Sequence, residues 1–510
     1  MRAAWVVAVL ILHACDGDTA SQDDIAPLVH AEPAGGTFGV ATAVTIIANE
    51  GTVYYTLDGS EPRPDQVGTV QGTRLAQLDL VEGHTTLRFV AIDAAGNRSP
   101  AGHEEYVVDL SPPMLTANPA TVAPVGLLAN ARVSFSTNEA IHYVVELAGS
   151  KLVEGDADAG EPIDVAVPGY RLSYAATTPV TLRATDGVGH ESSTMRELGL
   201  VAPIPITVGH VSLGRILVDP TGRRAYVAAD DDDRVDVIDL DRNSSTVHTK
   251  IASVTAGNTP RDLALTPDGG RLYVTNEQSN TISVIDTSSL QVTATLNTQS
   301  LPAGIAISSA GLRAYYTTQG ALHILDVNPA SPQYNQQIGV IGPHPQLFAS
   351  YIAISPNGRR MVLAWFSVSG QGTDVFDIDP AGGNYLQIIS SPLPLVASGS
   401  SHGVAISPDG SRAYARALTT PGVGLGVIDL ASGTVGAKYE NGGGYGLVVT
   451  PDGAILIACG PNWIRVHDTS NLAVLGNLTV GNGFDCAITP DGSELILMGT
   501  STQVWVMPLM

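Results

Sequence analysis

The sequence predicts an all-β protein with two Ig-like β-sandwiches followed by a seven-bladed β-propeller. Three observations support this prediction. Glycine and proline are abundant, with 54 Gly and 32 Pro among 510 residues, and only 15% of residues are charged. Short apolar runs alternate with turn residues from residue 30 onward, and from about residue 204 one turn sequence recurs. Short strands joined by tight turns explain all three.

The N-terminus has the pattern of an export signal. Residues 1–15, MRAAWVVAVLILHAC, combine Arg2 with an apolar run that is too short to span a bilayer. The ending LHAC resembles the lipobox of bacterial lipoproteins, although His13 departs from the small or β-branched residue usual there. This resemblance implies that Cys15 is acylated and becomes the mature N-terminus. An ordinary signal peptide with an unmodified cysteine is the alternative.

The segment after Cys15 predicts a tether. Residues 16–29 begin with the acidic stretch DGDTASQDD, which favours a flexible chain. We therefore expect a protein held by its N-terminal lipid in the bacterial cell envelope, on the periplasmic or cell-surface side. The outer membrane is favoured, and the inner membrane stays open. The formal net charge of −24 argues against nucleic acid as a partner.

Residues 30–110 predict the first sandwich, because their apolar runs alternate with turns. YTLDGSEP at residues 55–62 and AIDAAGN at residues 91–97 resemble the chitobiase C-terminal type of Ig-like module. In that family the module is usually an accessory spacer, so the resemblance implies position rather than activity. Residues 113–201 predict a second, diverged sandwich, since VTLRATDGVGH at 180–190 repeats the first module's closing strand.

Residues 204–510 predict the propeller. A turn centred on Pro-Asp-Gly or a variant recurs every 39 to 52 residues, which is the spacing of propeller blades. The seven turns begin at Pro220, Pro267, Ser309, Pro356, Pro408, Pro451 and Pro490. The order within each repeat is strand, turn, strand, loop, strand, turn, strand, which makes one four-stranded blade.

Two further features complete the predicted blades. The third strand ends in an aspartate in six repeats, where its carboxylate can accept hydrogen bonds from the next turn. These are Asp239, Asp286, Asp326, Asp377, Asp429 and Asp468. The last repeat stops after QVWV at 503–506, so residues 204–208 are expected to supply its fourth strand and close the ring.

The second repeat carries a family resemblance. Residues 260–296 contain the tetrapeptide YVTN at 273–276 within PRDLALTPDGGRLYVTNEQSNTISVIDTSSLQVTATL. This repeat resembles the YVTN β-propeller family, and the other repeats keep its frame without the tetrapeptide. The resemblance implies the propeller fold for about 300 residues.

Few motifs point to chemistry. GSSHG at 399–403 fits G-x-S-x-G, but it leads into an innermost strand without the strand-to-helix turn that a nucleophile elbow requires. The run of four aspartates at 230–233 favours a solvated loop over a calcium site. No cysteine or histidine spacing indicates a metal or haem site. We therefore predict no metal, no cofactor and no catalytic residue.

The predicted ligand-facing surface is the mouth where the innermost strands begin. The repeats differ most there, and variable loops on a rigid frame usually carry binding. The candidate residues are Arg215, Arg261, Asp262, His402, Tyr445 and Asp485. Cys459 and Cys486 are a candidate disulfide pair between the last two blades, with two separate buried thiols as the alternative.

These observations favour a binding or scaffold protein whose propeller engages a protein or a polysaccharide of the cell envelope. Two alternatives stay open. Related seven-bladed lactonases share this blade pattern and place polar residues at one mouth of the channel, so the resemblance implies that an enzyme of this type is one alternative. A purely structural component of the cell surface is the other. Fold alone does not decide among them.

Overall fold

The computed structural model describes residues 23–510 except 212–213, 343–348, 368–369, 391–402, 420–421, 441–444, 461, 481–484 and 500–501. Within this part the regular elements are strands and two short 3-10 helices, η1 (Gly169–Arg171) and η2 (Asp230–Asp232). None of the described helices is long and apolar enough to cross a membrane. Cys15 lies outside the described residues, so its acylation stays a prediction.

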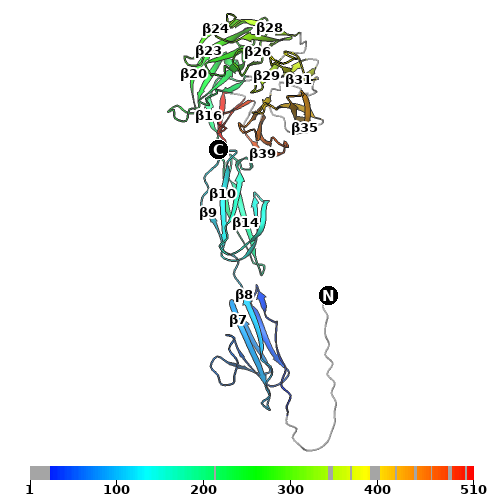
Figure 1. Cartoon of the computed structure of the whole chain (residues 1–510). Coiled ribbons are helices and arrows are strands. Elements are labelled where there is room, and N and C mark those ends of the chain that lie inside the picture. The colour runs from blue at the N-terminus through cyan, green and yellow to red at the C-terminus, as the bar shows by residue number, and fades with distance from the viewer. Residues whose placement is uncertain are drawn as a thin grey trace, which may run out of the picture. The chain divides into compact units, whose positions relative to one another are not determined.

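The first sandwich packs a three-stranded sheet on a five-stranded sheet (Figure 1). The smaller sheet contains β1 (Val29–Glu32), β3 (Thr42–Ala48) and β6 (Leu75–Leu80). The larger contains β2 (Gly36–Phe38), β8 (Gly102–Val108), β7 (Gly83–Ile92), β4 (Thr52–Thr56) and β5 (Val70–Gly72). Alternate residues of β3, Val44 and Ile46, are fully buried together with Leu87 and Tyr106. This alternation is the pattern that a strand with one solvated face requires.

The second sandwich pairs a three-stranded with a four-stranded sheet. The first contains β13 (Ile163–Pro168), β10 (Asn130–Thr137) and β9 (Leu115–Asn118). The second contains β12 (Ser150–Ala157), β11 (Ile141–Leu147), β14 (Thr178–Asp186) and β15 (Glu191–Leu198). Phe135 and Leu182 are fully buried in it. The segment that the sequence marks as a diverged copy therefore still buries its apolar face.

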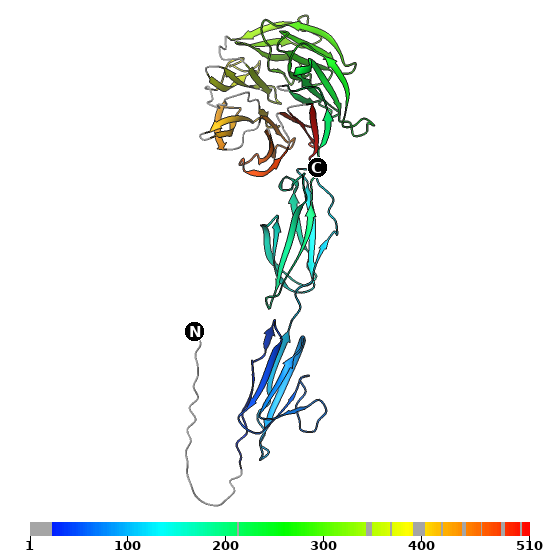
Figure 2. The same cartoon turned by 180° about the vertical axis from the view of Figure 1, so that it is seen from behind.

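The described part of the propeller forms seven sheets around a ring (Figures 1 and 2). Blade 1 is β17 (Ile216–Val218), β18 (Arg224–Ala229), β19 (Arg234–Asp239) and β20 (Thr249–Thr255). Blade 2 is β21 (Pro260–Leu265), β22 (Arg271–Asn276), β23 (Thr281–Asp286) and β24 (Gln291–Asn297). Blade 3 is β25 (Ile305–Ile307), β26 (Arg313–Thr318), β27 (Ala321–Asp326) and β28 (Gln337–Ile341).

Blade 4 is β29 (Ala349–Ile354), β30 (Arg360–Ser367) and β31 (Gly370–Asp377). Blade 5 is β32 (Val404–Ile406), β33 (Arg412–Thr419), β34 (Gly422–Asp429) and β35 (Thr434–Glu440). Blade 6 is β36 (Gly446–Val449), β37 (Ile455–Gly460), β38 (Trp463–Asp468) and β39 (Val474–Thr479). Blade 7 is β40 (Asp485–Ile488), β41 (Glu494–Met498), β42 (Gln503–Pro508) and β16 (Ile204–Thr207). The predicted fold class is confirmed.

Ring closure follows the prediction. β16 precedes blade 1 in sequence but pairs antiparallel with β42, and Ile204 lies opposite Val506. A strand from the start of the propeller therefore completes the sheet at its end, which pairs the edge of β42 and gives blade 7 its fourth strand. The six predicted aspartates also accept backbone N–H bonds from the turn that follows each of them.

The Pro-Asp-Gly turns form a repeating contact between blades. In blade 5, the Ser407 hydroxyl donates to Asp409, and the backbone N–H of Arg412 donates to Ser407. Thr266, Thr450 and Thr489 make the equivalent hydroxyl bond in their own turns. The turn glycine has φ near +70°, where a Cβ is strained, and in most blades it packs on the first residue of the preceding turn, usually proline. This end of the propeller is called the turn end below.

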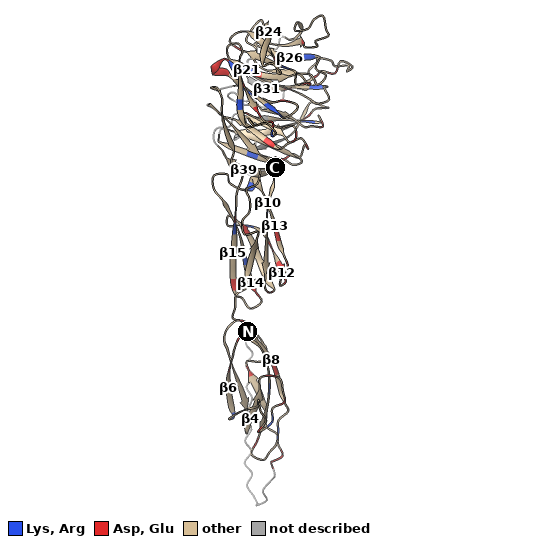
Figure 3. Ribbon diagram, turned by 90° about the vertical axis from the view of Figure 1, so that its left-hand side faces the viewer, with Lys and Arg blue, Asp and Glu red and all other residues tan. Residues whose placement is uncertain are grey.

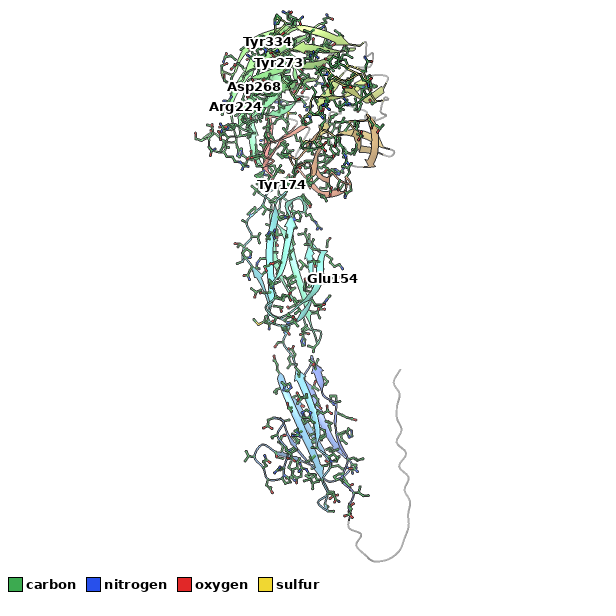
Figure 4. The ribbon with its side chains drawn as sticks, in the orientation of Figure 1. Glu154, Tyr174, Arg224, Asp268, Tyr273 and Tyr334 are labelled. Carbon is green, nitrogen blue, oxygen red and sulfur yellow. The ribbon has the colours of Figure 1, made fainter. Side chains whose placement is uncertain are left out.

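Arginines at the start of the second strand reinforce the turn end, and one of them, Arg224, is labelled in Figure 4. Arg224, Arg360 and Arg412 each donate to a backbone carbonyl of the next blade. Arg271 lies over the Tyr334 ring and Arg313 over the Tyr385 ring, again in the next blade. In blade 7 the equivalent residue is acidic instead of basic. Its Glu494 carboxylate is contacted by Arg242 and His248 of blade 1. Cross-blade contacts thus include the seam where the ring closes.

The turn end also carries contacts from the second sandwich. The backbone N–H groups of Leu127 and Leu128 donate to the carbonyls of Pro508 and Leu509, at 3.0 and 2.7 Å. A Cβ built on Gly476 would lie 2.3 Å from the Tyr170 carbonyl oxygen, so the backbones approach too closely for any other residue. Residues 118–134 and 164–180 accordingly belong to the same compact unit as the propeller. The mouth is the opposite end of the blades.

Candidate functional site

The innermost strands begin at the mouth, and five of the six predicted ligand-facing residues are described there. Arg215 precedes β17, Arg261 and Asp262 open β21, Tyr445 precedes β36, and Asp485 opens β40. His402 lies outside the described residues. Because the inner strands surround the channel, residues that are far apart in sequence become neighbours.

The structure brings three of these residues together. The Arg215 Nε lies 3.0 Å from Asp485 Oδ2 and 3.8 Å from Asp262 Oδ1. The Arg215 guanidinium carbon also lies 4.3 Å from the centre of the Tyr351 ring. These four side chains come from blades 1, 2, 4 and 7 and are called the Arg215 cluster below. They link the blades across the channel.

Both carboxylates of the cluster also hold the backbone of the following blade. Asp485 Oδ2 accepts the N–H of Ile216 at 3.2 Å, and Asp262 Oδ2 accepts the N–H of Ile305 at 2.9 Å. Asp262 Oδ1 additionally accepts the N–H of Leu263. Asp485 Oδ2 therefore faces Arg215 and also fixes the innermost strand of blade 1, whereas Asp262 faces Arg215 with Oδ1 and fixes the innermost strand of blade 3 with Oδ2.

Burial dominates the electrostatics of the cluster. Burial raises the pKa of Asp262 and of Asp485, and the Arg215 charge opposes that rise in both. For Arg215, burial acts to lower the pKa, but Asp485 and then Asp262 outweigh it, so its pKa is raised. Burial likewise raises the pKa of Tyr351. The cluster therefore holds a permanent cation and two carboxylates whose charged state is costly.

The other two described candidates have further contacts of their own. Arg261 pairs with Glu277 of its own blade, with Nε 2.9 Å from Oε2. The Tyr445 side chain is half-buried, and its backbone N–H donates to the Cys459 carbonyl. The sequence placed Tyr351 at the mouth without naming it as a ligand-facing residue, and it did not indicate Glu277. The position of Tyr351 at the start of an innermost strand was the available signal for it.

A second polar cluster lies outside the propeller. Ligand-type atoms of Asp109, Asp186 and His190 lie within 4.8 Å of one another. His190 Nδ1 is 2.9 Å from Asp186 Oδ2, and Nε2 is 2.7 Å from the Gly39 carbonyl oxygen. Both partners are acceptors, so the arrangement favours the imidazolium, and the Asp186 hydrogen bond is the first cause that raises the pKa of His190. Hydrogen bonding within the protein accounts for this cluster.

Charged residues elsewhere are dispersed. Figure 3 shows acidic and basic residues scattered over the strands instead of gathered on one face of the propeller. In the aspartate run of blade 1, Asp232 accepts the N–H of His210 and pairs with Arg234, while Asp233 accepts the N–H of Thr259. These two carboxylates therefore have different protein partners.

Comparison with known proteins supports the architecture. Residues 188–310 and 215–390 match the family model "Lactonase, 7-bladed beta-propeller", and residues 33–102 match "Chitobiase/beta-hexosaminidase C-terminal domain". The predicted propeller and the chitobiase-type module are thereby confirmed, whereas the YVTN assignment and the lipid anchor stay predictions.

Two individual proteins are also similar. Seven-bladed beta-propeller protein Rv1057 of Mycobacterium tuberculosis is 29% identical over 144 residues, which are 25% of this chain and 35% of that protein. The matched region therefore spans about a third of the relative. The solved structure titled Kuenenia stuttgartiensis Hydrazine Synthase has a TM-score of 0.49 at 19% identity and covers 59% of this chain and 96% of that one.

Proposed function

We propose that this protein is a lipid-anchored binding protein of the bacterial cell envelope, whose propeller mouth engages a protein or an envelope polysaccharide. The proposal rests on one observation: the charged groups of the Arg215 cluster contact one another and the backbone of neighbouring blades. Asp262 and Asp485 already form ion pairs with Arg215 and accept hydrogen bonds from the backbone of the next blade. Groups committed in this way shape a rigid surface and are poorly placed to exchange protons with a substrate.

The two ends of the propeller also favour the mouth as the binding face. Leu127 and Leu128 of the second sandwich bond the C-terminal segment at the turn end. The mouth carries the residues that differ between blades, and side-chain variety on a rigid frame is where binding usually resides.

Binding is tested with the full-length chain, purified in detergent, against an envelope polysaccharide array and an envelope protein extract. The triple variant Arg261→Ala, His402→Ala, Tyr445→Ala changes the mouth without touching the Arg215–Asp485 pair. The matched control is Arg223→Ala with Arg359→Ala, two exposed arginines beside turns at the other end. We expect the mouth variant to lose binding and the control to keep it. Binding that survives in the mouth variant, or that maps to residues 30–201, would contradict the proposal.

The anchor is tested separately. Cys15→Ser should move the protein from the membrane fraction to the soluble fraction, because the acylated residue is gone. A protein that stays with the membrane after this substitution is not anchored through Cys15.

A lactone hydrolase is the second candidate, favoured by one specific observation. Two buried carboxylates with raised pKa, Asp262 and Asp485, lie beside Arg215. Arg215 and Asp262 also fall within the region that matches the lactonase family model. Perturbed carboxylates of this kind are candidates for general acid or base catalysis. Hydrolysis of aliphatic or sugar lactones by the purified chain, abolished in Asp262→Asn or Asp485→Asn with the fold intact, would favour the enzyme over the binding protein.

A further inference from the structure

Cys459 and Cys486 come from different blades and are both buried. Cys459 lies near the end of β37 in blade 6 and is 0% exposed. Cys486 is the second residue of β40 in blade 7 and is 5% exposed. Both are free thiols in this structure. The disulfide that the sequence predicts between them therefore stays a prediction.

A glycine lies between the two cysteines. Gly446 of β36 is the direct cross-strand partner of Cys459. A Cβ built on Gly446 would lie 3.0 Å from Cys486 Sγ and 2.8 Å from the Cys486 backbone nitrogen. The Cys486 sulfur therefore lies over a position without a side chain, and the residue directly opposite that position is Cys459. Opposed residues in an antiparallel pair have Cα atoms only about 5 Å apart.

The environment of Cys486 agrees with this geometry. Burial raises the pKa of the Cys486 thiol well above its ordinary value, and a side-chain hydrogen bond with Cys459 adds to the rise. A thiol of this kind reacts slowly in the folded protein, because the thiolate is the nucleophile. The pair is therefore suited to a bond that forms during folding and then persists.

We propose that Cys459 and Cys486 form an inter-blade disulfide that fixes the position of Asp485 at the mouth. Two thiols lose two protons and two electrons, an S–S bond forms between them, and a small-molecule or protein disulfide takes the electrons and becomes two thiols. Cys486 follows Asp485 directly, and Asp485 bonds both Arg215 and Ile216 of blade 1. The bond thus links blades 6 and 7 beside the seam between blades 7 and 1. Its formation in the cell rests on the proposed envelope location, since that compartment is oxidising.

The bond is tested by lysing cells that make the full-length protein directly into denaturant with excess alkylating agent, so that buried thiols are exposed and blocked at once. The masses of the proteolytic peptides that contain the two cysteines are then measured. We expect one linked peptide pair, 2 Da lighter than the two thiol peptides together. In a second arm, purified reduced protein is unfolded and refolded with oxidised glutathione. Cys459→Ser and Cys486→Ser are the matched controls, and neither can give the linked pair.

The outcomes separate the bond from the location. A linked pair in both arms supports the proposal. A linked pair only in the glutathione arm supports the pairing of the two thiols and overturns the oxidising location. Two alkylated thiols in both arms, in protein that is folded by protease resistance, overturn the disulfide. If the bond holds blades 6 and 7 together beside Asp485, protease should cleave the oxidised protein several-fold more slowly than its Cys459→Ser variant. Equal cleavage rates would contradict that role of the bond.

Discussion

The contacts that join neighbouring blades differ between the two ends of the propeller. At the turn end, nearly every blade repeats one arrangement, in which a Ser or Thr hydroxyl bonds the turn carboxylate or amide and a glycine packs on the preceding turn. At the mouth, single residues of individual blades make the links. Thr275 donates to the Ala303 carbonyl, and Asp485 accepts from Ile216.

This difference shows where the sequence is constrained by the fold. A tight turn with φ near +70° accepts few residues, so seven copies stay similar. At the described part of the mouth, positive φ occurs at residues of different types, such as Asp233, Thr259 and Asn280, instead of at one repeated glycine. Its residues can therefore change as long as enough blades remain linked. Uniform contacts therefore mark the scaffold, and the irregular contacts mark the surface that is open to a specific role.

The largest effect is expected at the mouth. Asp485→Ala leaves the Arg215 charge with one fewer buried partner and the Ile216 N–H without its acceptor, so unfolding should become easier by about 3 kcal/mol. Trp365, Trp463 and Trp505 all lie in the propeller, so tryptophan fluorescence during urea unfolding reports this region. The control is Asp409→Ala at the turn end, whose carboxylate bonds only its own turn. A smaller loss for Asp485→Ala than for Asp409→Ala would break the comparison.

A smaller effect is expected at the turn end from backbone strain. Gly269 has φ of +70°, and a Cβ there would be 3.4 Å from Pro220, which is ordinary contact. Gly269→Ala should therefore cost about 1 to 2 kcal/mol through conformation alone. The neighbouring Gly270 lacks a positive φ and makes the matched control, since a Cβ there meets only the Asp268 side chain. Equal urea midpoints for the two variants would show that turn geometry does not explain the uniformity of this end.

The sequence predicted the repeated features well because each arises from local chemistry. The Pro-Asp-Gly turns, the aspartates that end the third strands and the closing strand at 204–207 are read from short segments. The Ig-like modules follow from alternation and a recognisable turn. Such features depend on backbone conformation, which neighbouring residues decide.

The mouth was predicted less completely because its contacts join distant blades. Arg215, Asp262 and Asp485 were expected at the same end of the channel, and they do meet. Their partner Tyr351 lies three blades from Arg215, and no local pattern relates the two residues. Arg261 pairs with Glu277, and the sequence pattern did not predict that ion pair. The direction of a side chain at the mouth depends on the partners that the other blades place near it.

The last and smallest effect is a difference in the sign of pH dependence between the two ends. Hydrogen bonds from Ser407 and Ser411 lower the pKa of Asp409 to about 2. Its contribution to stability is therefore present above the unfolded pKa of about 3.9 and is lost as pH falls toward 2. Burial instead raises the pKa of Asp485, so its contribution is fully present below about pH 3.9 and is lost as pH rises through its folded pKa.

Urea midpoints measured between pH 7 and pH 2.5 test this contrast. The stability difference between the natural chain and Asp409→Asn should shrink as pH falls below 4, because the natural carboxylate is then being protonated. The difference between the natural chain and Asp485→Asn should move in favour of the natural chain as pH falls from 7 toward 4, because the buried group becomes neutral. Slopes of the same sign for the two variants would mean that Arg215 outweighs burial at Asp485. In that case the mouth would be held together by charge in the same way as the turn end.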